Sequence, residues 1–480
     1  MKKIITLLIV IFIGATTQSY SQELAWSVAK KVKSRIIYTN ILGAFNNSYY
    51  VVRFNKKTKQ TFIIERYNRK LSIGNEFEFK LNKKYNVDKI ILLDGKVLIF
   101  YSIYDRGEKI YNLYCDILNS NLNVIKKRRF VTSTKVKSSN EHLFRIEKDI
   151  ASKQFLVFYP SEIIGDNIKF GFYVTDVNFA KHYHTKVNIG FANDFKIEDI
   201  YLSEKSVGVI LSSQFGKLLN KRKQLSFLYY DFEKEKREFV NLFNDSIKFT
   251  NVAFKYDLVN KSFTLNGFYS YLKERESIGV AFLNINKLDD RRTFRYIRFS
   301  DRIISDIMGR KKTKGNIEDF YPREVTMRND GGIIFSGEYF DVQKEYYNDY
   351  YNFNLSYVKY YYRYSDVFIM SINPDGNVDW FEIIRKDQVT MNDDGYYSSF
   401  LIGNSYDKLL VLYNDLEKNK WNLMSNQINP NGKLETKILV NGNQFDGYLI
   451  PKIGKQVNSN EILIPGFGKK KGFILLKIRI

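Results

Sequence analysis

Short apolar runs recur along the whole chain, and Gly, Asn or Asp bounds each of them. Runs of this length between turn-forming residues are typical of buried β-strands. A further strand pattern, such as VDKIILL from Val87, precedes each run. The apolar runs begin at Tyr49, Lys96, Gln154, Val207, Ser262, Gly331, Lys408 and Glu461.

A strand–turn–strand segment follows each apolar run and completes a repeated unit. These segments start at Phe62, Asn112, Gly171, Leu225, Gly279, Val367, Asn422 and Gly472. The last one stops at the chain end without its second strand. Repeats of this length, built from short strands alone, predict an all-β fold, a β-propeller of about eight four-stranded blades.

The stretch LAWSVAKKVK from Leu24 belongs to none of the units. An incomplete eighth blade would expose an unpaired strand edge. We therefore expect the N-terminal stretch to supply the missing outer strand and close the ring. Weak strand patterns near Ile146 and Ile450 leave seven blades as an alternative. Two β-sandwich domains fit less well, because the repeat runs on without a linker. We expect one domain over residues 22–480, with a helix from Asp301 between two blades.

Residues 1–21 have the pattern of a secretory signal peptide. Lys2 and Lys3 precede an apolar stretch from Ile4 to Ala15, which is shorter than the ~20 residues that span a bilayer. Small residues at the cleavage site predict a mature chain that begins at Gln22, and no Cys follows to carry a lipid anchor. We expect export, with no other segment that crosses a membrane.

The composition predicts a well-packed core and a basic surface. Hydrophobic residues make up 44% and aromatic residues 16% of the chain, and the net charge is +23. This charge would suit an anionic partner, such as an acidic polysaccharide, lipopolysaccharide, nucleic acid or an acidic protein. The lysines are nevertheless spread along the chain, as on a solvated surface, and we expect no specific nucleic-acid partner. We also expect a monomer. The single cysteine, Cys115, lies in an apolar strand and is expected to be a buried, inert thiol.

The longest insertion falls in blade six, over residues 340–365, and is rich in tyrosine. Antiparallel alternation places it on the same face as the connector that precedes the blade. Rigid aromatic side chains beside cations are common in recognition surfaces. An extended hairpin whose tyrosines pack on one another explains the pattern equally well. The candidate binding residues are Tyr346, Tyr347, Tyr350, Tyr351, Tyr357, Tyr360, Tyr361, Tyr362, Arg310, Lys311, Lys312 and Lys314.

No pattern of a nucleophile elbow, phosphate-binding loop or zinc protease occurs. His182 and His184 share a strand face without an identifiable third ligand. Asp375 begins a pattern like a calcium loop, but Trp380 stands where the loop needs Gly. We therefore expect no catalytic residue, metal or cofactor. The carboxylates that flank the insertion, Glu338, Asp341 and Asp366, keep a polysaccharide hydrolase or lyase as the alternative.

The stretch from Ser365 to Phe400, and the signal ending Tyr20-Ser21-Gln22, resemble uncharacterised secreted proteins of the Bacteroidetes. The resemblance covers about the last third of the chain. Because that family has no assigned activity, it implies no residue roles. The final strand, Phe473 to Ile480, is needed by the propeller, so we expect no separate sorting domain and favour the periplasm over the medium. Together these observations predict a non-catalytic binding or scaffold module for a protein or glycan at the cell envelope.

Overall fold

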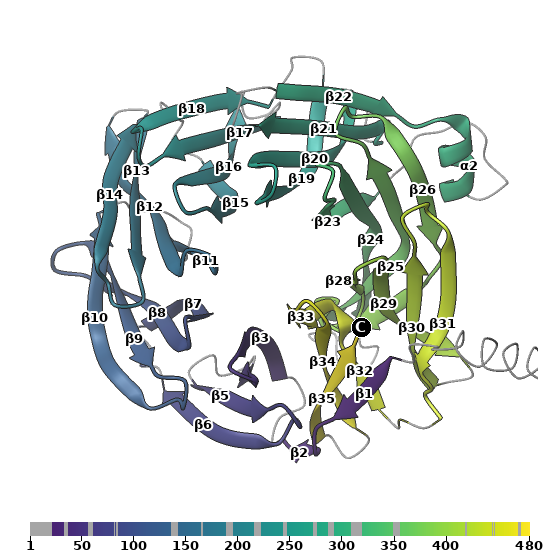
Figure 1. Ribbon diagram of the computed structural model, residues 1–480, viewed down its shortest axis with the longest axis horizontal. Coiled ribbons are helices and arrows are strands. Elements are labelled where there is room, and N and C mark those ends of the chain that lie inside the picture. Colours follow the sequence, from purple (N-terminus) through teal and green to yellow (C-terminus); the bar gives the residue numbers. More distant parts are fainter. Residues whose placement is uncertain are drawn as a thin grey trace, which may run out of the picture.

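The computed structural model shows eight antiparallel sheets arranged radially in a ring (Figure 1). The structure describes residues 22–32, 37–55, 61–80, 82, 85–135, 143–164, 167–188, 195–215, 222–242, 247–271, 276–286, 292–308, 319–348, 356–417, 420–443, 445, 447–468 and 472–480. In the first seven sheets along the chain, the first strand lies nearest the centre and the fourth lies at the rim. The predicted β-propeller is therefore confirmed, with eight blades rather than seven.

The first four blades are regular four-stranded meanders. Blade one contains β3 (Ile37–Phe45), β4 (Ser48–Asn55), β5 (Thr61–Asn68) and β6 (Ile73–Lys80). Blade two contains β7 (Tyr85–Leu93), β8 (Lys96–Asp105), β9 (Ile110–Leu118) and β10 (Val124–Thr134). Blade three contains β11 (Arg145–Asp149), β12 (Gln154–Ile164), β13 (Asn167–Asp176) and β14 (Lys181–Asn188). Blade four contains β15 (Phe195–Leu202), β16 (Ser206–Phe215), β17 (Arg222–Asp231) and β18 (Lys236–Asn241).

The next three blades include the one α-helix among the described residues. Blade five contains β19 (Ile247–Asp257), β20 (Ser262–Tyr271), β21 (Gly279–Asn286) and β22 (Arg292–Arg298), followed by α2 (Asp301–Met308). Blade six contains β23 (Phe320–Met327), β24 (Ile333–Asn348), β25 (Ser356–Ile372) and β26 (Val378–Ile384), and β27 (Gln388–Met391) also pairs with β25. Blade seven contains β28 (Phe400–Asn404), β29 (Leu409–Glu417), β30 (Lys420–Ile428) and β31 (Leu434–Val440).

Blade eight joins the two ends of the chain. Its inner strand is split into β32 (Gly447–Leu449) and β33 (Lys455–Asn458) by the 3₁₀ helix η1 (Pro451–Ile453). Pro451 lacks the N–H that a continuous strand needs, which explains the weak pattern near Ile450. The blade continues with β34 (Glu461–Gly468) and β35 (Gly472–Arg479). The N-terminal β1 (Glu23–Trp26) and β2 (Lys30–Lys31) then pair with β35 as the outer strand, as predicted.

The core fills the spaces between neighbouring blades. One apolar cluster, for example, joins Phe100 and Cys115 of blade two to Phe155 and Val157 of blade three. Cys115 is fully buried, and burial raises the pKa of its thiol well above the usual value, so it is the inert residue expected from the sequence. Among the described residues, no helix is long and apolar enough to cross a membrane.

Candidate functional site

The tyrosine-rich insertion of blade six is a strand pair rather than a loop. β24 and β25 have 16 and 17 residues, while β10, β12 and β19 have 11 each. β23 pairs with β24 only as far as Tyr339, so the two long strands continue beyond the blade. We call residues 340–348 and 356–365 the tyrosine hairpin. The expected loop over 340–365 is thus strand wherever the structure describes it, because aromatic residues favour the extended, cross-paired backbone.

Strand alternation divides the tyrosines between the two faces of the hairpin. The register pairs Lys344 with Tyr360 and Val342 with Tyr362, which places Tyr360 and Tyr362 on the face that also bears Tyr346. The opposite face bears Tyr347 and Tyr361, again by register. The tyrosines therefore form two rows, not one cluster. Tyr357 lies opposite Tyr347 in the backbone register.

The tip of the hairpin exposes aromatic surface to solvent. Tyr346 is 75% exposed and Tyr360 36% exposed. On the other face, two apolar side chains of β27, Val389 and Met391, are 52% and 49% exposed. Exposed aromatic and apolar side chains on a backbone held by cross-strand hydrogen bonds are suited to binding, because little conformational entropy is lost on contact.

Polar contacts hold several hairpin tyrosines in place. Lys359 Nζ lies 4.2 Å from the ring centre of Tyr347, whose hydroxyl donates a 2.5 Å hydrogen bond to Glu345. That hydrogen bond raises the pKa of Tyr347, and a further one with Tyr361 adds to it. The Tyr362 hydroxyl donates to Asp394 at 3.0 Å. These contacts orient the rings before any partner arrives.

Six of the predicted binding residues lie outside the described residues, so the structure places neither their side chains nor their backbone. They are Tyr350, Tyr351, Arg310, Lys311, Lys312 and Lys314. The expected proximity of the basic connector to the hairpin therefore stays a prediction.

A buried ionic network anchors the base of the tyrosine hairpin. Glu338 of β24 is fully buried, and its carboxylate lies 2.7 Å from Lys386 Nζ and 2.8 Å from Arg323 Nε. The Ser399 hydroxyl donates a third contact at 2.6 Å. Burial lowers the pKa of Lys386, although the nearby Glu338 carboxylate opposes the shift. A buried carboxylate held by two cations is well suited to fixing a backbone position.

The base also fixes one tyrosine that points away from solvent. Tyr364 is 4% exposed, and its ring centre lies 4.6 Å from that of Phe340. Its hydroxyl accepts a 2.9 Å hydrogen bond from Lys452 of blade eight. The hairpin is thus tied to a blade that is not its sequence neighbour.

Two of the three carboxylates that could serve a hydrolase are already engaged. Glu338 belongs to the buried network described above. Asp366 forms an ion pair with Arg385 and accepts a 3.3 Å hydrogen bond from the Lys386 amide. Asp341 is partly exposed on the hairpin. These three residues therefore do not form a pair of free, facing carboxylates of the kind glycosidases use.

Charged side chains on the inner strands form a second set, which the sequence analysis did not single out. β7, β11, β15 and β23 surround the centre of the ring in Figure 1. Lys89 Nζ of β7 lies 3.0 Å from Glu147 of β11, and Lys255 of β19 lies 3.9 Å from Glu324 of β23. These two ion pairs link neighbouring inner strands.

Strand bulges occur beside charged residues of three inner strands. The register with the second strand shifts between Val87 and Lys89, between Ile197 and Asp199, and between Pro322 and Glu324. A bulge re-aims side chains and is common near functional sites. The pairs Asp88–Lys89, Glu198–Asp199 and Arg323–Glu324 are the sequence signal for these bulges, because two adjacent charges interrupt otherwise apolar strands.

The inner wall shifts the pKa of two of its groups. Asp199 reaches solvent, yet desolvation by the surrounding protein raises its pKa to about 6. Burial, together with the positive charge of Lys455 from blade eight, lowers the pKa of Lys148 to about 8. Lys148 Nζ donates to the Leu92 carbonyl at 2.7 Å, and Lys455 donates to the Leu42 carbonyl at 3.1 Å. Both lysines therefore connect neighbouring blades.

His184 and Asp375, two of the candidates for metal binding, make hydrogen bonds within the protein. His184 lies 3.3 Å from the Tyr159 hydroxyl, and the side chain of His182 is outside the described part of the structure. Asp375 accepts a hydrogen bond from the Asn377 amide within a tight turn, where Gly376 has a φ of +86°. Across the described chain, no three His, Cys, Asp or Glu side chains converge as a metal site would require.

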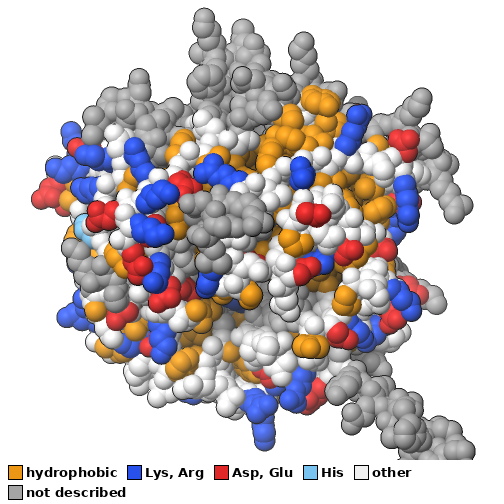
Figure 2. Space-filling model, turned by 45° about the horizontal axis from the view of Figure 1, so that its top comes forward, with side chains coloured by type: hydrophobic (Ala, Val, Ile, Leu, Met, Phe, Trp, Pro, Cys, Tyr) orange, Lys and Arg blue, Asp and Glu red, His pale blue; other side chains and the backbone are white. Residues whose placement is uncertain are grey.

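The excess positive charge does not gather in one place on the face seen in Figure 2. Lys and Arg side chains there are mixed with Asp and Glu. A solvated surface has this distribution, as the spread of lysines along the chain suggests.

Comparisons with known proteins give no family and only distant structural likenesses. No family model and no curated protein matches the chain. Among solved structures, the β-propeller domain of the Trilobed protease from Pyrococcus furiosus is 10% identical, with a TM-score of 0.37, over 87% of this chain and 98% of that one. The WD40 domain of SCAP from fission yeast is 8% identical, with a TM-score of 0.40, over 96% and 98%. A Bombyx mori GH32 β-fructofuranosidase is 10% identical, with a TM-score of 0.29, over 96% and 91%. Likenesses this distant support no conclusion about function, since propellers carry unrelated functions.

Proposed function

We propose that the protein is an exported, non-catalytic binding module that holds a protein or glycan partner at the cell envelope through the tyrosine hairpin. The single observation that carries the proposal is the combination of exposed aromatic tip and buried ionic base. Tyr346 and Tyr360 face solvent, while Glu338 at the base is fully buried between two cations.

This combination suits recognition rather than folding alone. A hairpin that served only to fill the core would bury its aromatic residues, as Tyr364 is buried. Large aromatic side chains contribute most of the affinity at many interfaces, and a preorganised backbone reduces the entropic cost of binding. Tyrosine suits protein and glycan partners alike, because its ring stacks and its hydroxyl donates hydrogen bonds.

The export step rests on the sequence. The charged, apolar and small-residue regions of residues 1–21 support a signal peptide, and the absence of a Cys after Ala15 in that signal supports a protein without a lipid anchor. We propose the periplasm as its location. A hydrolase is the less favoured function, because Glu338 and Asp366 are held by Lys386 and Arg385.

Site-specific photocrosslinking tests this function in intact cells. A photoreactive phenylalanine analogue is placed at Tyr346, and at Tyr406 in a separate strain as the control. Tyr406 is fully exposed on blade seven, so it matches Tyr346 in accessibility but not in position. We expect a discrete adduct at position 346 and none at position 406. A protein adduct is identified by its mass, and a glycan adduct by its loss on glycosidase treatment. Equal adducts at both positions, or none at position 346, would contradict the proposal.

A further inference from the structure

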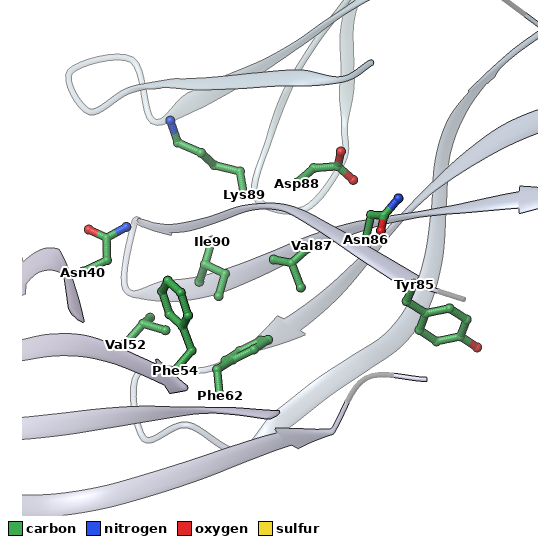
Figure 3. Close-up of a pocket in the computed structure, with 10 residues that line it drawn as sticks. All are labelled: Asn40, Val52, Phe54, Phe62, Tyr85, Asn86, Val87, Asp88, Lys89 and Ile90. Atoms are coloured by element: carbon green, nitrogen blue, oxygen red, sulfur yellow. The ribbon is translucent and has the colours of Figure 1, made fainter. Parts of the chain in front are cut away.

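A pocket of about 350 Å³ opens between blades one and two (Figure 3). Val52 and Phe62 are almost fully buried at its floor. Phe54, Val87 and Ile90 are half-buried along its walls. Asn40, Tyr85, Asn86, Asp88 and Lys89 complete the lining. The cavity is thus apolar inside and polar at its edge, as ligand pockets usually are.

The strand register explains why the cavity lies at this interface. Val52 is the fifth residue of β4 and pairs with Ile64 of β5. Phe100 holds the same position in β8 of blade two, where it pairs with Cys115. Phe158 holds it in blade three, where it pairs with Phe172. Each of these side chains faces the following blade. At this position blades two and three have a phenylalanine, whereas blade one has a smaller valine, so space remains between blades one and two.

The equivalent interface shows how a ring fits in this space. The Phe158 ring stacks on Phe170, with ring centres 4.9 Å apart and planes inclined by 6°. Phe170 stands two residues before Phe172, as Phe62 stands two residues before Ile64. Blade one thus keeps the aromatic partner, Phe62, but has Val52 at the position that Phe158 holds in blade three.

The surroundings of Phe62 support this view. One side of its ring is covered by Phe79, with centres 4.9 Å apart and planes inclined by 16°. At the mouth, Tyr85 is held by stacking on Tyr101 at 5.4 Å. Figure 3 shows Phe54, Phe62, Val52 and Ile90 converging on one side of β7, while Lys89 and Asp88 point to its other side. The enclosed space is therefore shaped by rigid rings.

The polar groups at the edge suit a small hydrogen-bonding substituent. Asn40 pairs with Val52 in the register, so its amide lies beside the floor of the pocket. An amide can both donate to and accept from a hydroxyl group. Lys89 is already paired with Glu147 at 3.0 Å, so the edge presents no unpaired lysine to attract a carboxylate.

We propose that this pocket binds a phenyl or phenol ring, supplied either by a free aromatic molecule or by the side chain of a peptide. The ring takes the place that Phe100 and Phe158 occupy in the next two interfaces and stacks on Phe62. This site is independent of the tyrosine hairpin, and neither proposal needs the other.

Binding of 4-fluorophenol to the mature chain, followed by ¹⁹F NMR, tests the pocket. For a ligand of this size we expect a Kd on the order of 1 mM. Val52→Phe supplies the missing ring and should weaken binding at least tenfold without lowering the melting temperature. Val259→Phe makes the same substitution at an exposed position between β19 and β20 of blade five and should leave the Kd unchanged.

A second measurement uses the wild-type chain, in case Val52→Phe disturbs folding. The δ1-methyl resonance of Ile90 should shift on titration with 4-fluorophenol, whereas that of Ile402 in blade seven should not. N-acetyl-tyrosinamide then separates the two sources: tighter binding than 4-fluorophenol indicates a peptide side chain, and weaker binding a free aromatic molecule. Absence of binding by both probes, or equal binding by Val52→Phe, would overturn the proposal.

Discussion

Buried charges decide the local stability of blade six. Lys386 and Glu338 are both without solvent exposure, and each depends on the other for compensation of its charge. Removing one partner of a buried ion pair leaves the other uncompensated, whereas removing both can be nearly neutral. Replacing only Lys386 or only Glu338 should therefore destabilise the protein more than replacing both.

Lys386→Met should destabilise the protein by about 3 kcal/mol, toward the lower end of the range for such pairs because Arg323 still faces Glu338. The double variant Lys386→Met, Glu338→Leu should recover a large part of this loss. Urea unfolding followed by tryptophan fluorescence measures both. Equal destabilisation by the single and double variants would show that the charges do not compensate one another.

Asp199 predicts a pH dependence whose sign follows from its raised pKa. Folding favours the protonated acid, so its contribution to stability is complete below the ordinary pKa of about 4 and is lost as the pH rises through about 6. Asp199→Asn should therefore raise the melting temperature at pH 8 by a degree or two, and much less at pH 4. A larger gain at pH 4 than at pH 8 would contradict the assigned shift.

At the scale of elements, the tyrosine hairpin separates a structural base from an exposed tip. The sequence predicted the insertion and its tyrosines, and it left recognition and packing equally open. The structure shows how both are served: Tyr346 and Tyr360 are exposed farther along the hairpin, while Tyr364, on the same face at the base, is buried against Phe340. Sequence spacing could not separate these roles, because exposure depends on where β23 and β27 stop pairing.

Tyr346→Ser with Tyr360→Ser should leave the melting temperature within about 1 °C of wild type, since exposed side chains contribute little to stability. Tyr364→Ser should cost about 3 kcal/mol, as expected for loss of a buried aromatic ring. Differential scanning calorimetry compares the two. If the tip variant melts as early as the base variant, the tip tyrosines belong to the core.

Sequence alone could predict the turns, but neither the buried ionic network at the base of the tyrosine hairpin nor the pocket between blades one and two. Turns such as Asn429-Pro430-Asn431-Gly432 were predictable, because Gly432 adopts the positive φ of +81° that such turns need. The pairing of Glu338 with Lys386 was not, because it joins a residue of β24 to one in the distant segment between β26 and β27. Nor was the space beside Val52, which becomes visible only when the blades are compared in register.

At the scale of the molecule, the N-terminal strand closes the ring. β1 pairs with β35 from Glu23 to Trp26, and the Ser27 amide donates to the Leu475 carbonyl at 2.9 Å. Lys30 then reaches blade one, where its ammonium lies 2.8 Å from Glu65. Burial alone would raise the pKa of Glu65, but hydrogen bonds from Arg53 and Lys30 outweigh it and lower that pKa. This short segment therefore joins the last blade to the first.

Deletion of residues 24–33 should open the ring and lower the melting temperature by several degrees. Lys30→Met keeps the strand but removes its contact with Glu65, so it should have a smaller effect. Hydrogen exchange should localise the new opening to β35. Unchanged melting of the deletion variant would mean that the N-terminal strand does not close the ring.

The most direct test of the central claim is a binding titration with the partner that crosslinks at position 346. Surface plasmon resonance compares wild type, Tyr346→Ser with Tyr360→Ser, and Tyr406→Ser. Loss of exposed aromatic anchors should weaken binding at least tenfold, whereas the Tyr406 control should bind like wild type. Equal affinities for all three proteins, with the folds intact, would contradict the assignment of the tyrosine hairpin as the binding surface.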